Sequence, residues 1–134
     1  MADRDEAMLE SSLKELQSHG SVSSLFLDIT NEAEVKERLE SVVKIYGQLD
    51  IMFNSAGIIG ATSTKIIDYD TATYEQVFRV NQLGSFLMTK HALLHMLPRN
   101  YGRILLMASI AGKDGNPGMA GYTSTKAAVI GLVK

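Results

Sequence analysis

The spacing of apolar residues along the chain predicts four helices. Apolar side chains recur every three or four residues in segments that begin at capping residues and end at glycine or proline. The predicted helices cover 4–19, ended by Gly20; 31–46, capped by Thr30 and ended by Gly47; 72–97, capped by Thr71 or Thr73 and ended before Pro98; and a last segment from Gly121 onward. The helix at 72–97 is the longest of the four.

Three short apolar runs between these helices predict buried strands. They are SSLFLD at 23–28, LDIMFNSAG at 49–57 and GRILLMAS at 102–109. Strands that alternate with helices form right-handed βαβ units in a parallel sheet covered on both faces. We therefore expect an α/β fold with a single domain over residues 1–134, without internal repeats or a domain linker.

Composition and charge narrow the classes of partner. The 134 residues are 46% hydrophobic, have a net charge of −2 and include no cysteine. A chain without a basic stripe is not expected to bind nucleic acid or an anionic membrane, and the absence of thiolates excludes a cysteine metal site. His19, His91 and His95 are too scattered to hold a metal. With no signal peptide or membrane-spanning run in the sequence, we expect a cytoplasmic protein whose partners are small molecules or another copy of itself.

Polar residues follow each of the three predicted strands at its carboxyl end. Asp28 follows the first strand, the segment 54–57 the second and Ser109 the third. The carboxyl ends of parallel strands open toward one crevice, where α/β proteins bind their ligands. Tyr122 and Lys126 come next, at i, i+4 spacing. Alone, this pair is equally consistent with an exposed pair on a helix.

Asn81 and Gly84 lie inside the predicted helix at 72–97. Both residue types weaken a helix interior relative to better helix formers. Apolar neighbours surround Asn81 in the stretch FRVNQLGSF, which favours a buried polar residue that perturbs the helix and binds a water. The alternative is an exposed asparagine tolerated at a small cost.

Taken in order, these residues resemble the short-chain dehydrogenase/reductase family. The shared features are an acid after one strand, Asn-x-Ala-Gly after the next, Asn in the long helix, Ser after the third strand and Tyr-x-x-x-Lys beyond it. The resemblance implies a Rossmann-like doubly wound parallel sheet. It also implies an NAD(P)-dependent oxidoreductase that interconverts a secondary alcohol and a ketone. The stretch AGKDGNPGMAGYTSTKAAVIGL is most similar to members that reduce 3-oxoacyl-carrier protein or oxidise sugars and sugar acids.

The resemblance further implies four catalytic residues. Tyr122 would be the acid/base, Lys126 its activator, Ser109 the hydroxyl that orients the substrate carbonyl, and Asn81 a link between lysine and solvent in a proton relay. A free phenol ionises near pH 10, and an ammonium about 4 Å away stabilises its anion by about 4 kcal/mol at an effective dielectric constant near 20. A lysine one helical turn from the tyrosine has the required reach.

The cofactor-binding residues implied by the resemblance are Asp3, Asp28, Ile29, Asn54, Ala56, Gly57, Tyr122 and Lys126. Asp28 corresponds to an acid that contacts adenine, and small residues such as Gly57 let the backbone approach the ribose. Asp3 corresponds to the acceptor for the ribose 2′-hydroxyl, which favours NAD over NADP, although Arg4 could attract a 2′-phosphate. The alternative for Asp3 is a solvated charge near a helix start, and the alternatives for Asp28 are a helix N-terminal charge and a turn-forming acid. Ser55 replaces the family's usual second Asn.

The family's Gly-rich turn between the first strand and helix does not occur in this sequence, whose first glycine, Gly20, follows a helix. Ala2 and Asp3 then correspond to the end of the family's second strand. We expect an incomplete sheet, with the third to fifth strands present and the first two and the last absent. In the order 3-2-1-4-5-6, the strand ending at Asp28 does not touch the strand before Asn54.

From this incompleteness we expect the 134 residues to be inactive alone and to belong to a longer enzyme that forms a homodimer or homotetramer. The alternative is a truncated, non-catalytic protein derived from the same family. Such a protein would associate through the helix at 72–97 and the helix from Gly121.

Overall fold

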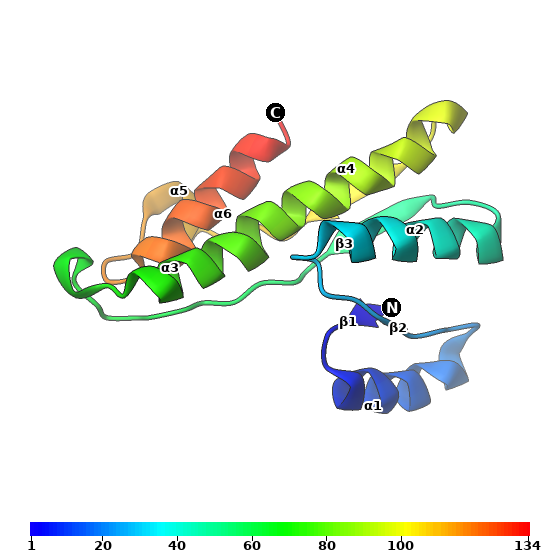
Figure 1. The fold of residues 1–134 in the computed structure, drawn as a ribbon, viewed down its shortest axis with the longest axis horizontal. Coiled ribbons are helices and arrows are strands. Elements are labelled where there is room, and N and C mark those ends of the chain that lie inside the picture. Colours follow the sequence, from blue (N-terminus) through cyan, green and yellow to red (C-terminus); the bar gives the residue numbers. More distant parts are fainter.

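Two short parallel sheets and the helices around them make up the α/β fold, which the computed structural model describes over residues 1–134 (Figure 1). The strands are β1 (Ala2–Asp3), β2 (Leu25–Phe26), β3 (Ile51–Asn54) and β4 (Arg103–Leu106). The helices are α1 (Glu6–Leu16), α2 (Glu32–Tyr46), α3 (Thr71–Phe78), α4 (Gly84–Met96), α5 (Ala111–Asp114) and α6 (Ala120–Leu132). Short 3-10 turns lie at η1 (Gln17–His19), η2 (Ile66–Asp68) and η4 (Leu97–Arg99), and a π-helical segment at η3 (Arg79–Leu83).

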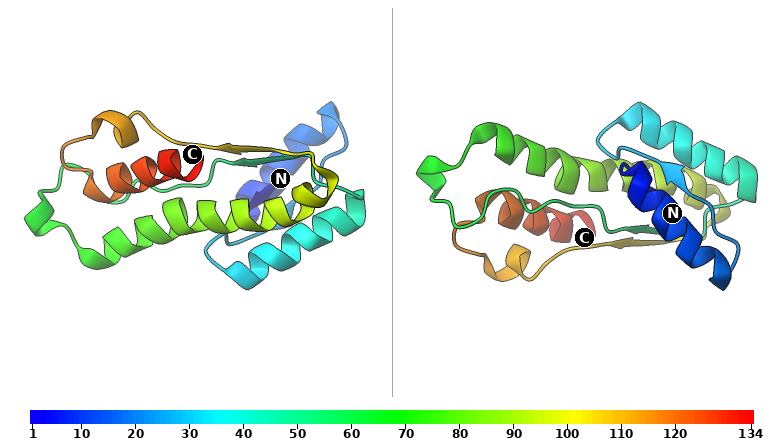
Figure 2. Two further views of the ribbon diagram at one scale, coloured as in Figure 1. Left: turned by 90° about the horizontal axis from the view of Figure 1, so that it is seen from above. Right: turned by 90° about the horizontal axis from the view of Figure 1, so that it is seen from below.

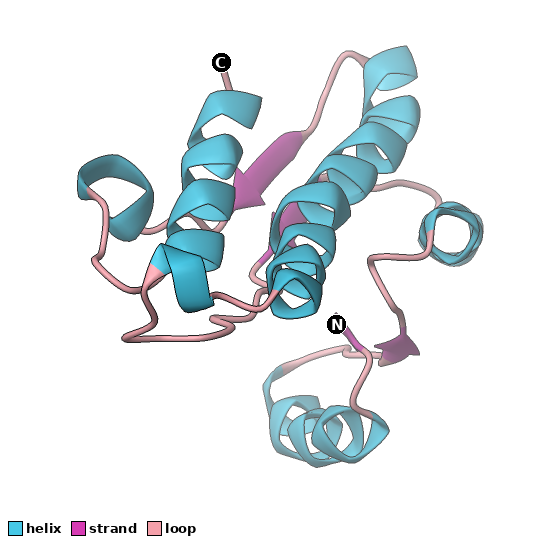
Figure 3. Ribbon diagram, turned by 60° about the vertical axis from the view of Figure 1, so that its left-hand side comes forward, coloured by secondary structure: helices cyan, strands magenta, loops and turns pink.

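The sheet is divided between two separate pairs of strands. β1 pairs in parallel only with β2, and β3 pairs in parallel only with β4. The strand that leads to Asp28 therefore does not touch the strand before Asn54, as predicted for an incomplete doubly wound sheet. The pairing of Ala2 with Leu25 confirms that the chain begins beside β2, in the place expected for the end of a second strand. Figure 3 shows the two pairs of strands apart from each other.

Two helices have capping residues other than those that the sequence predicted. Asn31, not Thr30, caps α2, and Asp70, rather than Thr71 or Thr73, caps α3. Each capping side chain accepts a hydrogen bond from the backbone N–H three residues later. The amide or carboxylate oxygen is well placed to satisfy a free N–H group in the first turn, and it prevails over a neighbouring threonine.

The predicted helix at 72–97 is interrupted in its middle. α3 and α4 are joined through the π-helical η3, where the N–H of Gly84 donates to the carbonyl of Arg79, five residues earlier. Asn81 lies within η3 and is 1% exposed. The prediction that Asn81 is buried and perturbs its helix is confirmed. Single π-helical turns inside α-helices occur frequently at functional sites.

The core lies between β2, α2, β3 and α4. It consists of Leu27, Val35, Leu39, Met52, Leu87, Met88, Ala92 and Met96. The rod formed by α3, η3 and α4 extends from this core and packs on α6, which runs beside it in both views of Figure 2. No helix in the structure has the combination of length and apolar character needed to cross a membrane.

Candidate functional site

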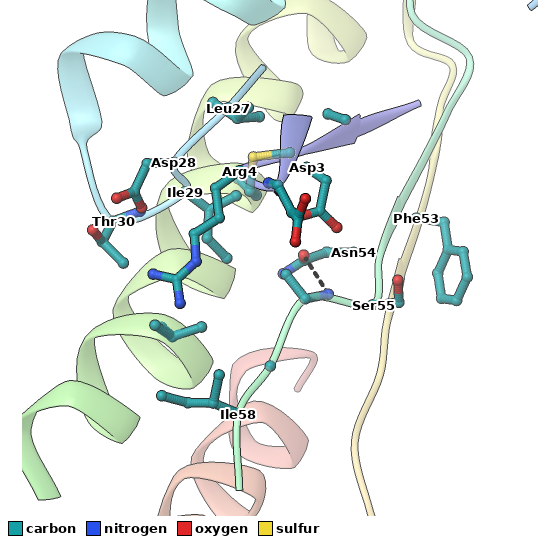
Figure 4. Close-up of a pocket in the computed structure, with 16 residues that line it drawn as sticks. Asp3, Arg4, Leu27, Asp28, Ile29, Thr30, Phe53, Asn54, Ser55 and Ile58 are labelled. Atoms are coloured by element: carbon teal, nitrogen blue, oxygen red, sulfur yellow. Dashed lines mark hydrogen bonds between the residues drawn. The ribbon is translucent and has the colours of Figure 1, made fainter. Parts of the chain in front are cut away.

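A cavity of about 480 Å³ lies where β1, β2 and β3 reach their carboxyl ends. Three chain segments, 2–5, 27–30 and 53–58, supply most of its lining, and Val80 and Met88 complete it from the long rod. The cavity brings together six of the residues that the sequence predicted for cofactor binding: Asp3, Asp28, Ile29, Asn54, Ala56 and Gly57. Figure 4 shows the turn at Asp28, Ile29 and Thr30 on one side of this space and Asn54, Ser55 and Ile58 on the other.

The acidic residues of the cavity also shape the backbone around it. One carboxylate oxygen of Asp28 accepts from the N–H of Thr30 at 2.8 Å, and one of Asp3 accepts from the N–H of Asp5 at 3.1 Å. The Asp28 carboxylate therefore takes the turn-forming role considered as its alternative, and the carboxylates of Asp3 and Asp28 each retain a second oxygen. Arg4 lies between Asp28 and Asp3 in Figure 4 and forms no ion pair.

Asn54, at the end of β3, is 6% exposed and connects the cavity to the long rod. Its Oδ1 accepts from the N–H of Ala56 at 3.3 Å, and its Nδ2 donates to the Oγ of Ser85 at 3.1 Å. Ser85 in turn donates to the carbonyl oxygen of Asn81 at 2.7 Å. The sequence analysis missed Ser85. The signal that could have found it is a serine four residues after Asn81, a spacing at which its hydroxyl reaches back to a helix carbonyl.

Asn81 joins three segments through its side-chain amide. Its Oδ1 accepts from the N–H of Ile58 at 2.8 Å, and its Nδ2 donates to the carbonyl of Ile58 at 2.9 Å and to the Oγ1 of Thr125 at 3.1 Å. Both amide hydrogens thus have protein acceptors, so a water of the expected kind can bind this side chain only at Oδ1. The residue holds the loop after β3 and helix α6 against η3.

Lys126, one turn into α6 from Tyr122, is a buried lysine. It is 4% exposed, its Nζ donates to the carbonyl of Met107 at 2.5 Å, and the same nitrogen lies 5.7 Å from the centre of the Tyr122 ring. Burial lowers the pKa of its ammonium below the ordinary value. A Cβ atom on Gly57 would lie 3.4 Å from this Nζ and 3.3 Å from Oδ1 of Asn81. Gly57 therefore lines the cavity on one side and packs against Asn81 and Lys126, two of the predicted catalytic residues, on the other.

Ser109 follows β4, and α5 holds it close to α6. Its Oγ accepts from the N–H of Ala111 at 3.2 Å, and it is not hydrogen-bonded to Tyr122. A Cβ on Gly112 would come within 2.5 Å of the backbone of Lys126, so α5 packs on α6 at the level of the lysine. Tyr122 itself is half-buried in the first turn of α6.

The lining of the cavity suits an adenine nucleotide. Leu27, Ile29, Val80 and Met88 offer apolar surface to a flat base, and the free oxygens of Asp3 and Asp28 can accept from ribose or amino hydrogens. The Gly-rich turn that would bind a pyrophosphate does not occur in the chain. The residues present thus fit the adenosine part of NAD(P). Ser109, Tyr122 and Lys126 do not line this cavity.

Comparisons with known proteins agree with this geometry. The family model described as short chain dehydrogenase matches residues 1–134. Secoisolariciresinol dehydrogenase of Forsythia intermedia is 39% identical over 121 residues, which cover 89% of this chain and 44% of that protein. Short chain aldehyde dehydrogenase 1 of Euphorbia lathyris is 35% identical over 134 residues, 100% of this chain and 46% of that protein.

Solved structures of similar proteins have the same fold as this chain. NAD+-bound xylitol dehydrogenase superposes with a TM-score of 0.94 at 34% identity, over 98% of this chain and 50% of the other. ElxO with NADP bound gives a TM-score of 0.87 at 34% identity, over 98% and 53%. The chain thus spans about half the length of the relatives that it matches. By its motifs, its fold and these matches, the chain belongs to the short chain dehydrogenase family.

Proposed function

We propose that this chain carries the catalytic residues and part of the nucleotide site of an NAD(P)-dependent oxidoreductase that interconverts a secondary alcohol and a ketone. The observation that supports this most directly is the environment of Lys126. A lysine that is 4% exposed, with a carbonyl but no carboxylate beside it, lies between Tyr122 and the wall of the nucleotide cavity.

The unneutralised ammonium favours negative charge on the neighbouring phenol. An ammonium about 4 Å from a phenolate oxygen attracts it by about 4 kcal/mol at an effective dielectric constant near 20, and Nζ of Lys126 lies 5.7 Å from the centre of the Tyr122 ring. A carboxylate beside the lysine would cancel much of this field, and the structure places none there. The pair is therefore suited to give and take a proton at the Tyr122 hydroxyl.

The remaining residues have distinct roles in the proposed reaction. The nicotinamide ring supplies or accepts the hydride. In the reductive direction, Tyr122 donates its proton to the substrate oxygen, and the Ser109 hydroxyl donates a hydrogen bond to the same oxygen. Asn81 keeps the loop at Ile58 and helix α6 in register, so that Lys126 stays beside Gly57. The oxidative direction reverses these transfers.

We infer a preference for NAD over NADP from the charges in the cavity. Three carboxylates, those of Asp3, Asp5 and Asp28, line it against the single cation of Arg4. An added 2′-phosphate would face this excess of negative charge. Solved relatives are found with either cofactor, as the NAD+-bound xylitol dehydrogenase and the NADP-bound ElxO illustrate.

We also propose that two copies associate through the rod and α6. A cavity of about 230 Å³ on this side is lined by Phe78, Gln82, Leu83, Phe86, Ala128, Val129 and Leu132. Phe78 is 39% exposed and Phe86 45% exposed, although both are aromatic, and they lie on either side of η3 along the rod. Such a face suits an interface between copies. It would also serve the alternative, non-catalytic member of the family.

The test of the proposed reaction is Tyr122→Phe in the protein expressed from the complete coding sequence. We expect turnover of secondary alcohols with NAD to fall by about 10³-fold, because a positioned acid/base contributes on this scale, while NADH binding changes less than twofold. Tyr101→Phe is the control, since Tyr101 is 51% exposed and lies before β4, at the end opposite the site. Retained turnover in Tyr122→Phe would remove Tyr122 from its role, and a wild-type protein that binds NADH without turnover would favour the non-catalytic alternative.

A further inference from the structure

The proposed reaction leaves Gly84 without a role, although the residue is buried next to the π-helical turn. Its backbone has φ −58° and ψ −42°, an ordinary right-handed helical conformation. The backbone therefore does not require glycine here, and in a helix interior alanine is the more favourable residue. The residues packed against Gly84 explain why glycine stands at this position.

Gly84 touches Ile29, a wall of the nucleotide cavity. A Cβ on Gly84 would lie 2.5 Å from Cδ1 and 2.7 Å from Cγ1 of Ile29. Met88, one turn further along the same face of the rod, and Val80, one turn before, both line the cavity, whereas Gly84 between them does not. The side chain of Ile29 thus fills the position that a side chain at residue 84 would occupy.

The turn that carries Ile29 has little freedom to move away. On one side, the N–H of Leu27 donates to the carbonyl of Asp3 at 3.0 Å. On the other, the carboxylate and the carbonyl of Asp28 accept from the N–H groups of Thr30 at 2.8 Å and Asn31 at 3.1 Å. The backbone on either side of Ile29 is therefore held.

Helix α2, which begins directly after this turn, is itself fastened to the rod. Glu32 accepts from Nζ of Lys90 at 2.6 Å, and its Oε1 lies 3.2 Å from Nε2 of the buried His91. The hydrogen bond from Lys90, with a smaller contribution from His91, holds the pKa of the Glu32 carboxyl below its ordinary value, so the contact is ionic at neutral pH. A side chain at residue 84 would consequently displace the end of Ile29, and the cavity is the open direction.

We propose that Gly84 is a positioning residue for nucleotide binding, because its missing side chain lets Ile29 lie against the rod instead of projecting into the adenine end of the cavity. This inference rests on the proposed function, since it assumes that the cavity binds the adenosine part of NAD(P). Gly84 does not contact the nucleotide itself and acts through Ile29.

The experiment measures AMP and NADH binding by calorimetry in the protein expressed from the complete coding sequence. We expect Gly84→Ala to raise both dissociation constants, and the KM for NAD, by about tenfold, the scale of overpacking an interior by one methyl group. The kcat at saturating NAD should fall less than twofold, because the atoms around Lys126 are not displaced. Gly131→Ala is the matched control, since it also lies in a helix but has nothing within 4 Å of its added Cβ.

A double-mutant cycle identifies the route of the effect. In an Ile29→Ala background, which lacks Cγ1 and Cδ1, adding Gly84→Ala should change AMP binding less than twofold. If Gly84→Ala fails to fold, Ile29→Phe tests the same contact, because the larger ring cannot lie over Gly84 and should weaken AMP binding.

Each outcome bears on a different claim. A wild-type protein that binds neither AMP nor NADH would overturn the proposed function, and this inference with it. Normal AMP binding by Gly84→Ala or by Ile29→Phe would overturn this inference alone. So would an equal loss of binding from Gly84→Ala with and without the Ile29 side chain.

Discussion

Lys126 is the one lysine among the buried residues of the chain. It is 4% exposed and has one hydrogen-bond acceptor, the Met107 carbonyl, for three N–H donors. Removing an ammonium from water without a counter-ion favours its neutral form and lowers its pKa. Burying the ammonium therefore lowers the stability of the folded chain. The proposed action of Lys126 on Tyr122 gives a reason for this cost.

The cost of burying Lys126 predicts a dependence of stability on pH. Because the pKa of Lys126 is lower in the folded chain than its ordinary value of 10.5, the unfolded chain binds more protons between the two values. The burial cost is fully present below the folded pKa, decreases as pH rises through that value, and is lost above 10.5. Lys126→Met lacks this cost, so its free energy of unfolding should improve relative to wild type as pH falls from about 10 to 7.

Urea denaturation at both pH values measures this difference. Lys36→Met is the control, because the Lys36 side chain is 61% exposed. A difference between Lys126→Met and wild type that stays constant with pH would mean that the folded structure does not perturb Lys126.

At the scale of elements, η3 is the connection between the proposed nucleotide cavity and the predicted catalytic residues. Its Asn81 holds Ile58 and Thr125 by its side chain, and its backbone carbonyl accepts from Ser85, which also binds Asn54. A regular α-helix would place these groups differently along and around the rod. The π-helical turn thus positions one polar cluster to contact both β3 and α6.

Ser85→Ala should destabilise this connection. It leaves the buried Nδ2 of Asn54 without its acceptor and the carbonyl of Asn81 without the hydroxyl donor. An unsatisfied buried group of this kind costs about 1–3 kcal/mol, and we expect a loss of that size in the free energy of unfolding measured by urea denaturation.

Ser41→Ala is the matched control for this loss. Its hydroxyl also donates back to a helix carbonyl, that of Arg38 at 2.9 Å, but bridges to no other element. We expect a change within about 0.5 kcal/mol there. Equal effects of the two substitutions would show that the bridge from Ser85 to Asn54 contributes nothing to stability.

At the scale of the whole molecule, the two sheets leave much apolar surface uncovered. Of 134 residues, 21 are buried, and Ile51, Phe53 and Leu105 on β3 and β4 are between 52% and 67% exposed. The facing edges of β1 and β3 have no partner strand in the structure. Unpaired edges and exposed apolar faces promote association of chains. The expectation that the 134 residues are inactive alone remains a prediction, and these surfaces are its structural support.

The proposed interface between copies predicts the effect of a charge on the rod. In the protein expressed from the complete coding sequence, Phe86→Glu should shift the mass measured by light scattering toward that of a monomer, because a carboxylate would be buried at the interface. Ile67→Glu, at a residue that is 84% exposed in η2, should leave the mass unchanged. An unchanged mass for Phe86→Glu would place any association on another surface.

Some contacts of this site follow from the order of the strands, and others depend on how the elements pack against one another. Only the first kind could be predicted from the sequence. Asp28, Asn54 and Gly57 could be predicted to share one cavity, because strand exits of a parallel sheet meet at one edge. Ser85 and the contact between Ile29 and Gly84 could not. They depend on the register of the rod against β3 and the turn after β2, and residues up to 55 positions apart in sequence, Ile29 and Gly84, meet there.

By itself, the sequence determined the four main helical segments, the strands, their parallel order and the motif that indicates the family, because periodicity and spacing are local properties. It did not determine the capping residues of α2 and α3 or the short helix α5. Only the tertiary structure decided that the long helix contains a π-helical turn and that the amide hydrogens of Asn81 bind protein acceptors. It also decided that Lys126 is buried without a counter-ion and that the side chain of Ile29 fills the space next to Gly84. These features arise when side chains distant in sequence compete for the same volume and the same hydrogen-bonding groups, a competition that no local pattern records.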